Sequence, residues 1–299
     1  MNTQQLYKLM RHRNCITIIS TVALTLMVTA PLTSQDQKPQ PQQKVEKLSK
    51  WPALKATESE RVRSTARQFK KPQEKLHAAA TKRLIATGPA VAPIIIPMVN
   101  DRPESINDNL FEVLDAVLNK KHSALLARET KRPSVEWRRY LIRKLATFHD
   151  AELAPVFKNT IKDKDADIAA YGAIALLSLG NHDGLEIAML AAKQRWAEFG
   201  DFASKVLAAG RSEKGAMPIF KKIESARPTD QMAGLRLLRY LIVQDQRALL
   251  KRYLESSDFT VKKEAINTAR VLFGEKPLDK LSSFQAIDQA KTWLNKLSG

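Results

Sequence analysis

Apolar residues in this chain recur at the spacing of amphipathic helices, and the helices themselves recur about every 31 residues. Seven segments end alike, and successive ends lie 30 to 34 residues apart. The segment ends are Gly88, Leu118, His149, Gly180, Gly210, Gln244 and Gly274. Four of these ends are Gly, which suits the end of a helix where the backbone needs a positive φ. The pattern therefore predicts a helix before each end.

The buried face of these helices is marked by columns of apolar residues. In the last five segments, the residues one and three positions before the end are all apolar. Leu177 and Leu207 occupy the second of these columns in neighbouring segments. Three more columns, which lie four, seven and eight positions before the end, are mostly apolar. Together the five columns trace one face of a helix. We therefore expect both leucines in the core.

Another helix follows each segment end. Three of these helices carry a proline at the same phase, Pro93, Pro155 and Pro218, and these prolines lie 62 and 63 residues apart, or two periods. A proline near the start of a helix is tolerated, because the first N–H groups have no partner within the helix. Two helices per repeat and no strand pattern predict an all-α fold, an α-solenoid.

The order of these features resembles that of HEAT repeats over about residues 72–275. After the proline of the first helix, an Asp and a branched apolar residue open the second helix, as in residues 165–168 and 258–261. In the second of these segments, two basic residues follow at 262–263. The resemblance implies a right-handed α-solenoid of about seven HEAT-like helix pairs. The basic residue is absent at residues 169–170 and 233–234, where an Asp–Arg ladder between repeats is not implied.

The N-terminus has the order of a signal peptide. Three basic residues precede an uncharged run over residues 15–30, and a polar Pro/Gln-rich stretch follows. This run of 16 residues is shorter than the roughly 20 that a membrane-spanning helix needs. We expect residues 1–34 to be a cleaved signal and the protein to be exported, to the periplasm or outside the cell. The alternative is an uncleaved membrane anchor at residues 15–30.

The composition divides the rest of the chain into a linker and a folded part. Residues 35–50 are rich in Pro and Gln and almost free of apolar side chains, which predicts a disordered linker. Residues 51–299 then form the solenoid. We expect the Arg/Lys-rich residues 55–83 to cap its N-terminal end and residues 278–299 to cap its C-terminal end, because terminal repeats need a polar outer face.

The charge favours acidic partners. The net charge is +18, and residues 38–83 alone carry 13 basic and 4 acidic residues, a balance of +9. Such a surface attracts acidic proteins or anionic polymers, although a solvated basic surface needs no partner. Lys144, Lys205 and Arg239 share one position of the repeat, five residues before the segment end. They form the candidate partner-binding ridge.

The sequence offers little catalytic chemistry. Cys15 is the only cysteine, the five histidines lack zinc spacing, and no nucleophile or nucleotide motif occurs. Asp163, Asp165 and Asp167 resemble the start of a calcium loop, but the Gly and Glu that such a loop requires are replaced by Ile168 and Ile174. We interpret them as helix-capping residues. We therefore expect no catalytic, metal or cofactor-binding residues, no cofactor, and a protein that is not an enzyme.

These features together predict an exported HEAT-repeat scaffold that binds a protein or an anionic polymer on its concave face. HEAT-like families also include DNA glycosylases and bilin lyases, so the alternatives are a nucleic-acid-binding or base-processing protein and a cofactor lyase. The basic and aromatic residues 137–140 suit nucleic acid, whereas an export signal argues against it. Contact with a membrane is expected only through an uncleaved N-terminal segment. The identity of the partner and the oligomeric state stay open.

Overall fold

The computed structural model describes residues 45–103 and 105–298. Every regular element among these residues is a helix, so this part of the chain is all-α. The α-helices are α2 (Ala56–Arg67), α3 (Glu74–Thr87), α4 (Ala92–Ile95), α5 (Asn107–Val117), α6 (Ser123–Arg128), α7 (Val135–Ala146), α8 (Ala154–Thr160), α9 (Ala166–Ser178), α10 (Leu185–Gln194), α11 (Trp196–Ala209), α12 (Glu213–Ile223), α13 (Pro228–Leu241), α14 (Lys251–Leu254), α15 (Phe259–Leu272) and α16 (Ser283–Ser298). The short 3₁₀ helices are η1 (Gln68–Lys70), η2 (Gly88–Val91), η3 (Ile96–Met98), η4 (Lys120–His122), η5 (Glu129–Lys131), η6 (Ala151–Leu153) and η7 (Gln244–Leu250).

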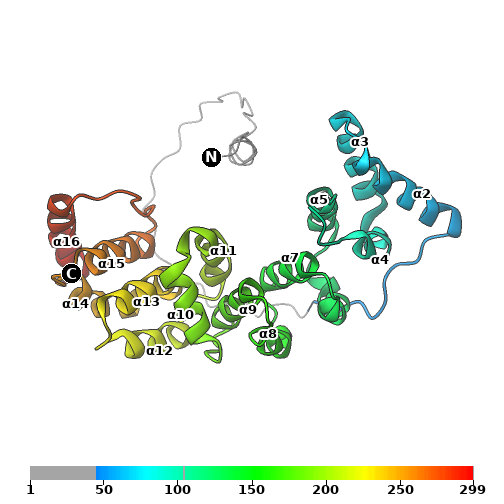
Figure 1. Cartoon of the computed structure of the whole chain (residues 1–299). Coiled ribbons are helices and arrows are strands. Elements are labelled where there is room, and N and C mark those ends of the chain that lie inside the picture. Colours follow the sequence, from blue (N-terminus) through cyan, green and yellow to red (C-terminus); the bar gives the residue numbers. More distant parts are fainter. Residues whose placement is uncertain (1–44, 104, 299) are drawn as a thin grey trace, which may run out of the picture. The chain divides into compact units, whose positions relative to one another are not determined.

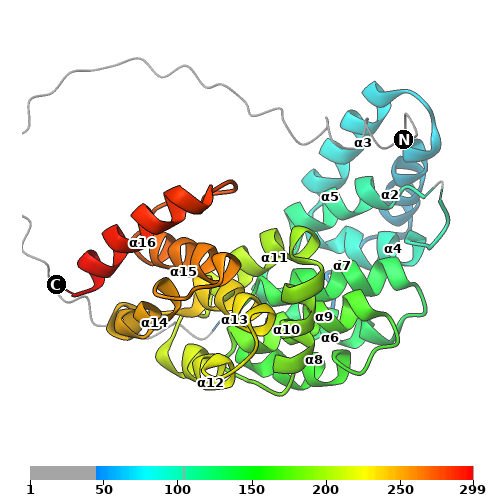
Figure 2. The same ribbon diagram turned by 60° about the vertical axis from the view of Figure 1, so that its left-hand side comes forward.

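The helices form a repeat-like arrangement. The helices that precede the seven segment ends are α3, α5, α7, α9, α11, α13 and α15, and each packs against the next. The helices between them, such as α8 and α12, pack against the helix that follows. Figures 1 and 2 show these elements following one another in chain order. The predicted segment ends lie no more than three residues beyond the observed helix ends, so the helical repeat architecture is confirmed.

The recurring prolines lie in the first helix of their pairs, as predicted. Pro93 and Pro155 lie in the first turns of α4 and α8, where the N–H groups of an α-helix have no partner within that helix. Pro218 lies inside α12, which continues through it to Ile223. The same residue type therefore begins two helices and is accommodated within a third.

The glycines at the helix ends have two different roles. Gly88, Gly180 and Gly274 have φ angles of 77°, 71° and 79°, as the pattern predicted. Gly210 instead has a φ of −95°, so the prediction of a positive φ is wrong there. A Cβ atom at Gly210 would lie 1.9 Å from the carbonyl oxygen of Ser178. Glycine is needed at this position because the ends of α9 and α11 approach closely.

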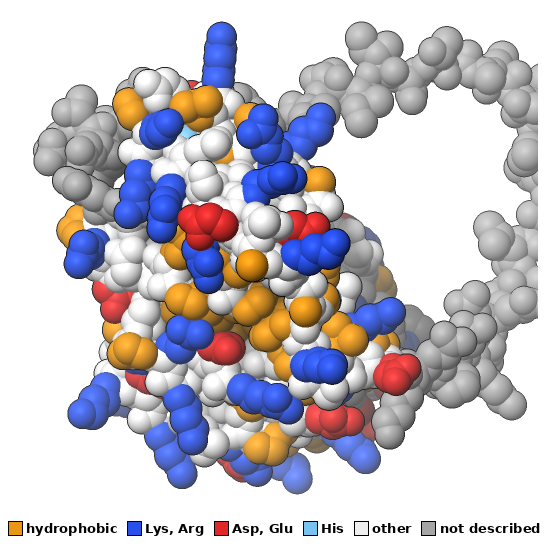
Figure 3. Space-filling view, turned by 90° about the vertical axis from the view of Figure 1, so that its right-hand side faces the viewer, with side chains coloured by type: hydrophobic (Ala, Val, Ile, Leu, Met, Phe, Trp, Pro, Cys, Tyr) orange, Lys and Arg blue, Asp and Glu red, His pale blue; other side chains and the backbone are white. Residues whose placement is uncertain are grey.

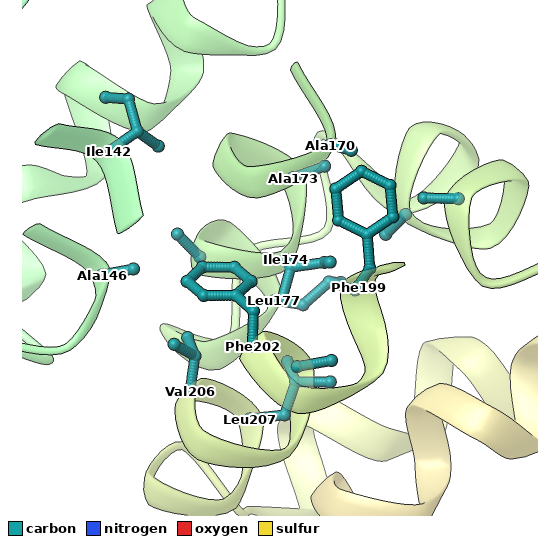
Figure 4. Close-up of a cluster of buried hydrophobic side chains, with 14 of the residues drawn as sticks. Ile142, Ala146, Ala170, Ala173, Ile174, Leu177, Phe199, Phe202, Val206 and Leu207 are labelled. Atoms are coloured by element: carbon teal, nitrogen blue, oxygen red, sulfur yellow. The ribbon is translucent and has the colours of Figure 1, made fainter. Parts of the chain in front are cut away.

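The core is continuous from one helix pair to the next. Figure 4 shows part of it, where aliphatic and aromatic side chains of α7, α9 and α11 meet. Leu177 and Leu207 are fully buried, as the apolar column predicted. Ala170 and Ala173 of α9 are small and buried, which lets the neighbouring helices approach α9 on several sides.

The predicted linker is ordered in the part that the structure describes. The signal or anchor at residues 1–34 and the linker up to residue 44 lie outside the described residues. Leu48 donates its N–H to the carbonyl of Lys121 at 2.9 Å, and Nζ of Lys47 lies 2.6 Å from carboxylate oxygens of Asp150 and Glu152. The prediction of a flexible tether is therefore wrong for residues 45–50, because these polar contacts fix them to the repeats.

One described stretch, Glu74–Met98, is long and apolar enough to cross a membrane by length and composition alone. In the structure this stretch is not one straight helix, because α3 ends at Thr87 and the φ of 77° at Gly88 turns the chain. Within its most apolar window, 44% of the residues are buried against the rest of the protein. Helices in the core of a protein pass the same test, and this stretch supplies core residues such as Leu84 and Val91.

Candidate binding site

A cleft of about 500 Å³ lies between α2 and α3, at the N-terminal end of the described helices. Its residues come from two helical stripes. Leu54 and four residues of α2 form one stripe, and four residues at the end of α3 form the other. The lining residues are Leu54, Glu58, Arg61, Val62, Thr65, Arg83, Leu84, Ala86 and Thr87. Spacings of three and four residues place each set on one face of its helix.

The floor of the cleft is apolar and its rim is charged. Val62 and Leu84 are buried, and Leu54 packs against the core from the side. Arg61 and Arg83 stand on the rim and are exposed. Neither guanidinium forms an ion pair with any residue of the described chain, whereas nearby Arg63 and Arg67 both approach Glu60. The cleft thus combines a surface for apolar side chains with two available positive charges.

The surroundings of the cleft are strongly basic. Residues 54–87 contain nine Lys or Arg and three Asp or Glu, a net charge of +6. The carboxylate of Glu58 accepts a hydrogen bond from the backbone N–H of Lys55 at 3.1 Å, so it serves the start of α2. Figure 3 views the side that carries α2 and α3, and hydrophobic side chains gather there among many Lys and Arg. This charge would attract an acidic ligand toward the cleft.

The three ridge residues do not form a row of exposed charges. The Nζ of Lys144 lies 3.0 Å from Oδ1 of Asp115, and the Lys144 side chain is only 13% exposed. Arg239 is 6% exposed and pairs with Glu264, which is equally buried. Of the three ridge residues, Lys205 alone is exposed and forms no ion pair with a described residue. The two other charges stabilise contacts between neighbouring helices instead.

The Asp-rich turn before α9 is a capping motif, as interpreted from the sequence. Oδ1 of Asp165 accepts hydrogen bonds from the N–H groups of Asp167 and Ile168. Burial raises the pKa of Asp165, but its bonds to the Arg139 guanidinium and these N–H groups outweigh that effect and hold the pKa below its usual value. Asp163 binds Arg138, with Nε and Oδ2 3.0 Å apart. Within residues 45–103 and 105–298 no group of three or more His, Cys, Asp or Glu side chains is arranged to hold a metal ion.

Ion pairs between repeats also occur where the HEAT-like pattern lacks its basic residue. Nη1 of Arg195, just before α11, lies 2.6 Å from Oδ1 of Asp167 in α9. In the same way, Nε of Arg236 in α13 lies 3.1 Å from Oε1 of Glu264 in α15. Helices without the basic residue at its usual place are therefore joined by arginines from other positions of the repeat.

Sequence reasoning recognised the basic character of residues 55–83 but did not identify the cleft. Leu54, Glu58, Arg61, Val62 and Thr65 recur at helical spacing, which is the signal that one face of α2 is shared by apolar and charged residues. The partner stripe on α3 follows only once the two helices are known to pack together.

No family model matches this chain, and no curated protein matches it. A solved structure of human deoxyhypusine hydroxylase in complex with glycerol resembles it, with a TM-score of 0.33 and 14% sequence identity, over 80% of this chain and 98% of that chain. The neighbour is an enzyme, so we withdraw the expectation that this chain is not one. That expectation rested on the absence of catalytic motifs. Such an absence argues against particular kinds of chemistry, but not against catalysis as a whole. A similarity this distant carries no argument about activity.

Proposed function

We propose that this chain is an exported helical-repeat protein that binds an acidic segment of another protein at the cleft between α2 and α3. The observation that supports this is the pairing of an apolar floor, Val62 and Leu84, with the unpaired rim arginines Arg61 and Arg83. An amphipathic acidic helix presents the complementary pattern, with apolar anchors on one side and carboxylates beside them.

The apolar floor favours a protein segment over an anionic polymer. Exposed ion pairs contribute only about 0.2–1 kcal/mol each, so two rim arginines alone give weak binding. Burying one large aliphatic side chain contributes about 1.5–3 kcal/mol more. Polyanions such as nucleic acids present mainly phosphates to a basic surface, and they leave an apolar cleft unfilled.

Reversing the charge of the rim should abolish most of the binding. We expect Arg61→Glu with Arg83→Glu to weaken binding of a labelled amphipathic peptide, with only Glu on its polar face, at least tenfold, or about 1.4 kcal/mol. Fluorescence anisotropy measures this affinity. The matched control is Lys214→Glu with Lys221→Glu, two exposed residues of α12 that form no ion pair among the described residues.

Two outcomes would contradict the proposal. If both double variants weaken binding equally, only the net charge of +18 matters. If polyglutamate of the same length binds as tightly as the amphipathic peptide, the apolar floor is not used. Binding that falls with added salt is expected in either case.

Export is supported by the order of basic, apolar and polar residues at the N-terminus. We expect the mature N-terminus to lie between Pro31 and Asp36, and intact-mass spectrometry of the protein from its native cells measures it. A soluble cytosolic protein that retains Met1 would contradict export and favour the nucleic-acid-binding alternative.

We also propose that the helices form a right-handed α-solenoid of about seven HEAT-like helix pairs. The recurring proline and Asp positions support this fold. It is also supported by the contacts of each second helix with the next, from α3 to α15.

A further inference from the structure

Helix α16 has one buried face and one exposed face that is partly apolar. Ala286, Ala290, Trp293 and Leu297 recur every three or four residues and are buried. They pack α16 onto α14 and α15, at the opposite end of the sequence from the cleft, as Figures 1 and 2 show. This face accounts for the attachment of α16 to the repeats.

The other face exposes large apolar side chains. Phe284 is 75% exposed and Ile287 is 45% exposed. Both lie on the side of α16 that faces away from its buried residues, and Leu294, near this side, is half-buried and packs against the core. No described residue covers Phe284, the most exposed large apolar side chain of those that the structure describes. Such a side chain in water has an unfavourable free energy that contact with another surface would relieve.

The same face carries two opposite charges at a particular spacing. Asp288 and Lys291 are exposed, lie between Ile287 and Leu294, and form no ion pair with any residue that the structure describes. Lys296, by contrast, is engaged by Glu275 and lies over the Trp293 ring. Asp288 and Lys291 are therefore available to an outside partner.

We propose that this face binds the same face of a second copy of the chain, with the two α16 helices antiparallel about a twofold axis. An axis between residues 289 and 290 places Asp288 opposite Lys291 of the second copy. The symmetry repeats the contact in reverse, so two ion pairs form. The same axis places Phe284 opposite Asn295 of the second copy, next to the half-buried Leu294, so the second copy covers the exposed ring of Phe284.

The charge pattern selects this occupant over others. A parallel pair of α16 helices would place Asp288 beside Asp288 and Lys291 beside Lys291. The apolar run at residues 15–30 of the chain is uncharged, so it would leave both charges without a partner. A helix of 16 residues is about 24 Å long, so the interface is small and the dimer should be weak and concentration-dependent.

Sedimentation velocity of the full chain over a range of concentrations tests this. We expect a reversible dimer, and we expect Phe284→Glu with Ile287→Glu to raise its dissociation constant at least tenfold. The matched control, Ile85→Glu with Leu190→Glu, changes two exposed aliphatic residues of α3 and α10 and should leave the dimer unchanged. A wild-type protein that stays monomeric, or a dimer that survives the α16 variant, overturns the proposal.

A charge exchange tests the antiparallel register itself. Asp288→Lys alone and Lys291→Asp alone each place like charges together in a self-dimer, so each should raise the dissociation constant severalfold. A mixture of the two variants restores both ion pairs across the interface, and so does the double exchange within one chain. Both should therefore dimerise like the wild type. Single variants that weaken the dimer without recovery in the mixture overturn the antiparallel pairing.

Discussion

Replacing Leu177 or Leu207 by Ala is expected to lower the free energy of unfolding by about 2–5 kcal/mol. Both side chains are fully buried, in neighbouring helices α9 and α11, within the cluster of Figure 4. The loss combines the transfer of the removed methyl groups with the cavity that remains. The expected loss is large because α9 packs against α7, α8, α10 and α11. These contacts leave α9 little freedom to move and fill the cavity.

Urea denaturation followed by circular dichroism measures this change. Lys221→Ala is the control, because Lys221 is exposed on α12 and has no ion pair among the described residues, and it should change the free energy by less than about 0.5 kcal/mol. Equal midpoints for the leucine variants and the control would show that the apolar column does not form the core.

Replacing Gly210 by Ala is expected to cost about 3 kcal/mol, at the upper end of what overpacking usually costs. The φ of −95° is open to any residue, so the backbone conformation is not the cause. The new Cβ would lie 1.9 Å from the Ser178 carbonyl oxygen, and a backbone atom cannot rotate away as a side chain can. The end of α11 must therefore move away from α9, which loosens the contact between two repeats.

Thermal unfolding of Gly210→Ala, compared with Ala208→Ser on the exposed side of α11, measures this cost.

Substitution by Asn distinguishes a steric clash from a positive φ as the reason for a glycine. Gly180 has a φ of 71° with open space around it, so Gly180→Asn should cost less than Gly180→Ala, since Asn tolerates this conformation. Gly210→Asn should cost at least as much as Gly210→Ala. The opposite order at Gly210 would contradict the close approach of the two helices.

The sequence by itself determined the helices, their ends and their buried sides. Whether a residue such as Leu177 or Leu207 faces the core depends on the period of apolar positions along its own helix, which is a local property. Asp165 likewise caps α9 through bonds to N–H groups two and three residues away. A positive φ at Gly180 follows from the same local rule for helix ends.

Only the tertiary structure decided which charges are available. Lys144 and Arg239 share a repeat position with Lys205, yet they pair with Asp115 and Glu264 from neighbouring helices, while Lys205 stays exposed. Coulomb energies depend on distance and burial, and both are set by how the helices stack, not by the position of a residue within its repeat. A repeat pattern therefore cannot distinguish a structural ion pair from a binding residue.

The cleft and the role of Gly210 have the same origin. The cleft requires that stripes on α2 and α3, about 20 residues apart in the sequence, face each other across a gap. Gly210 meets a carbonyl 32 residues earlier. Periodicity reports which side of a helix is apolar, but it contains no information on how closely two backbones approach, because that distance results from the packing of all side chains between them.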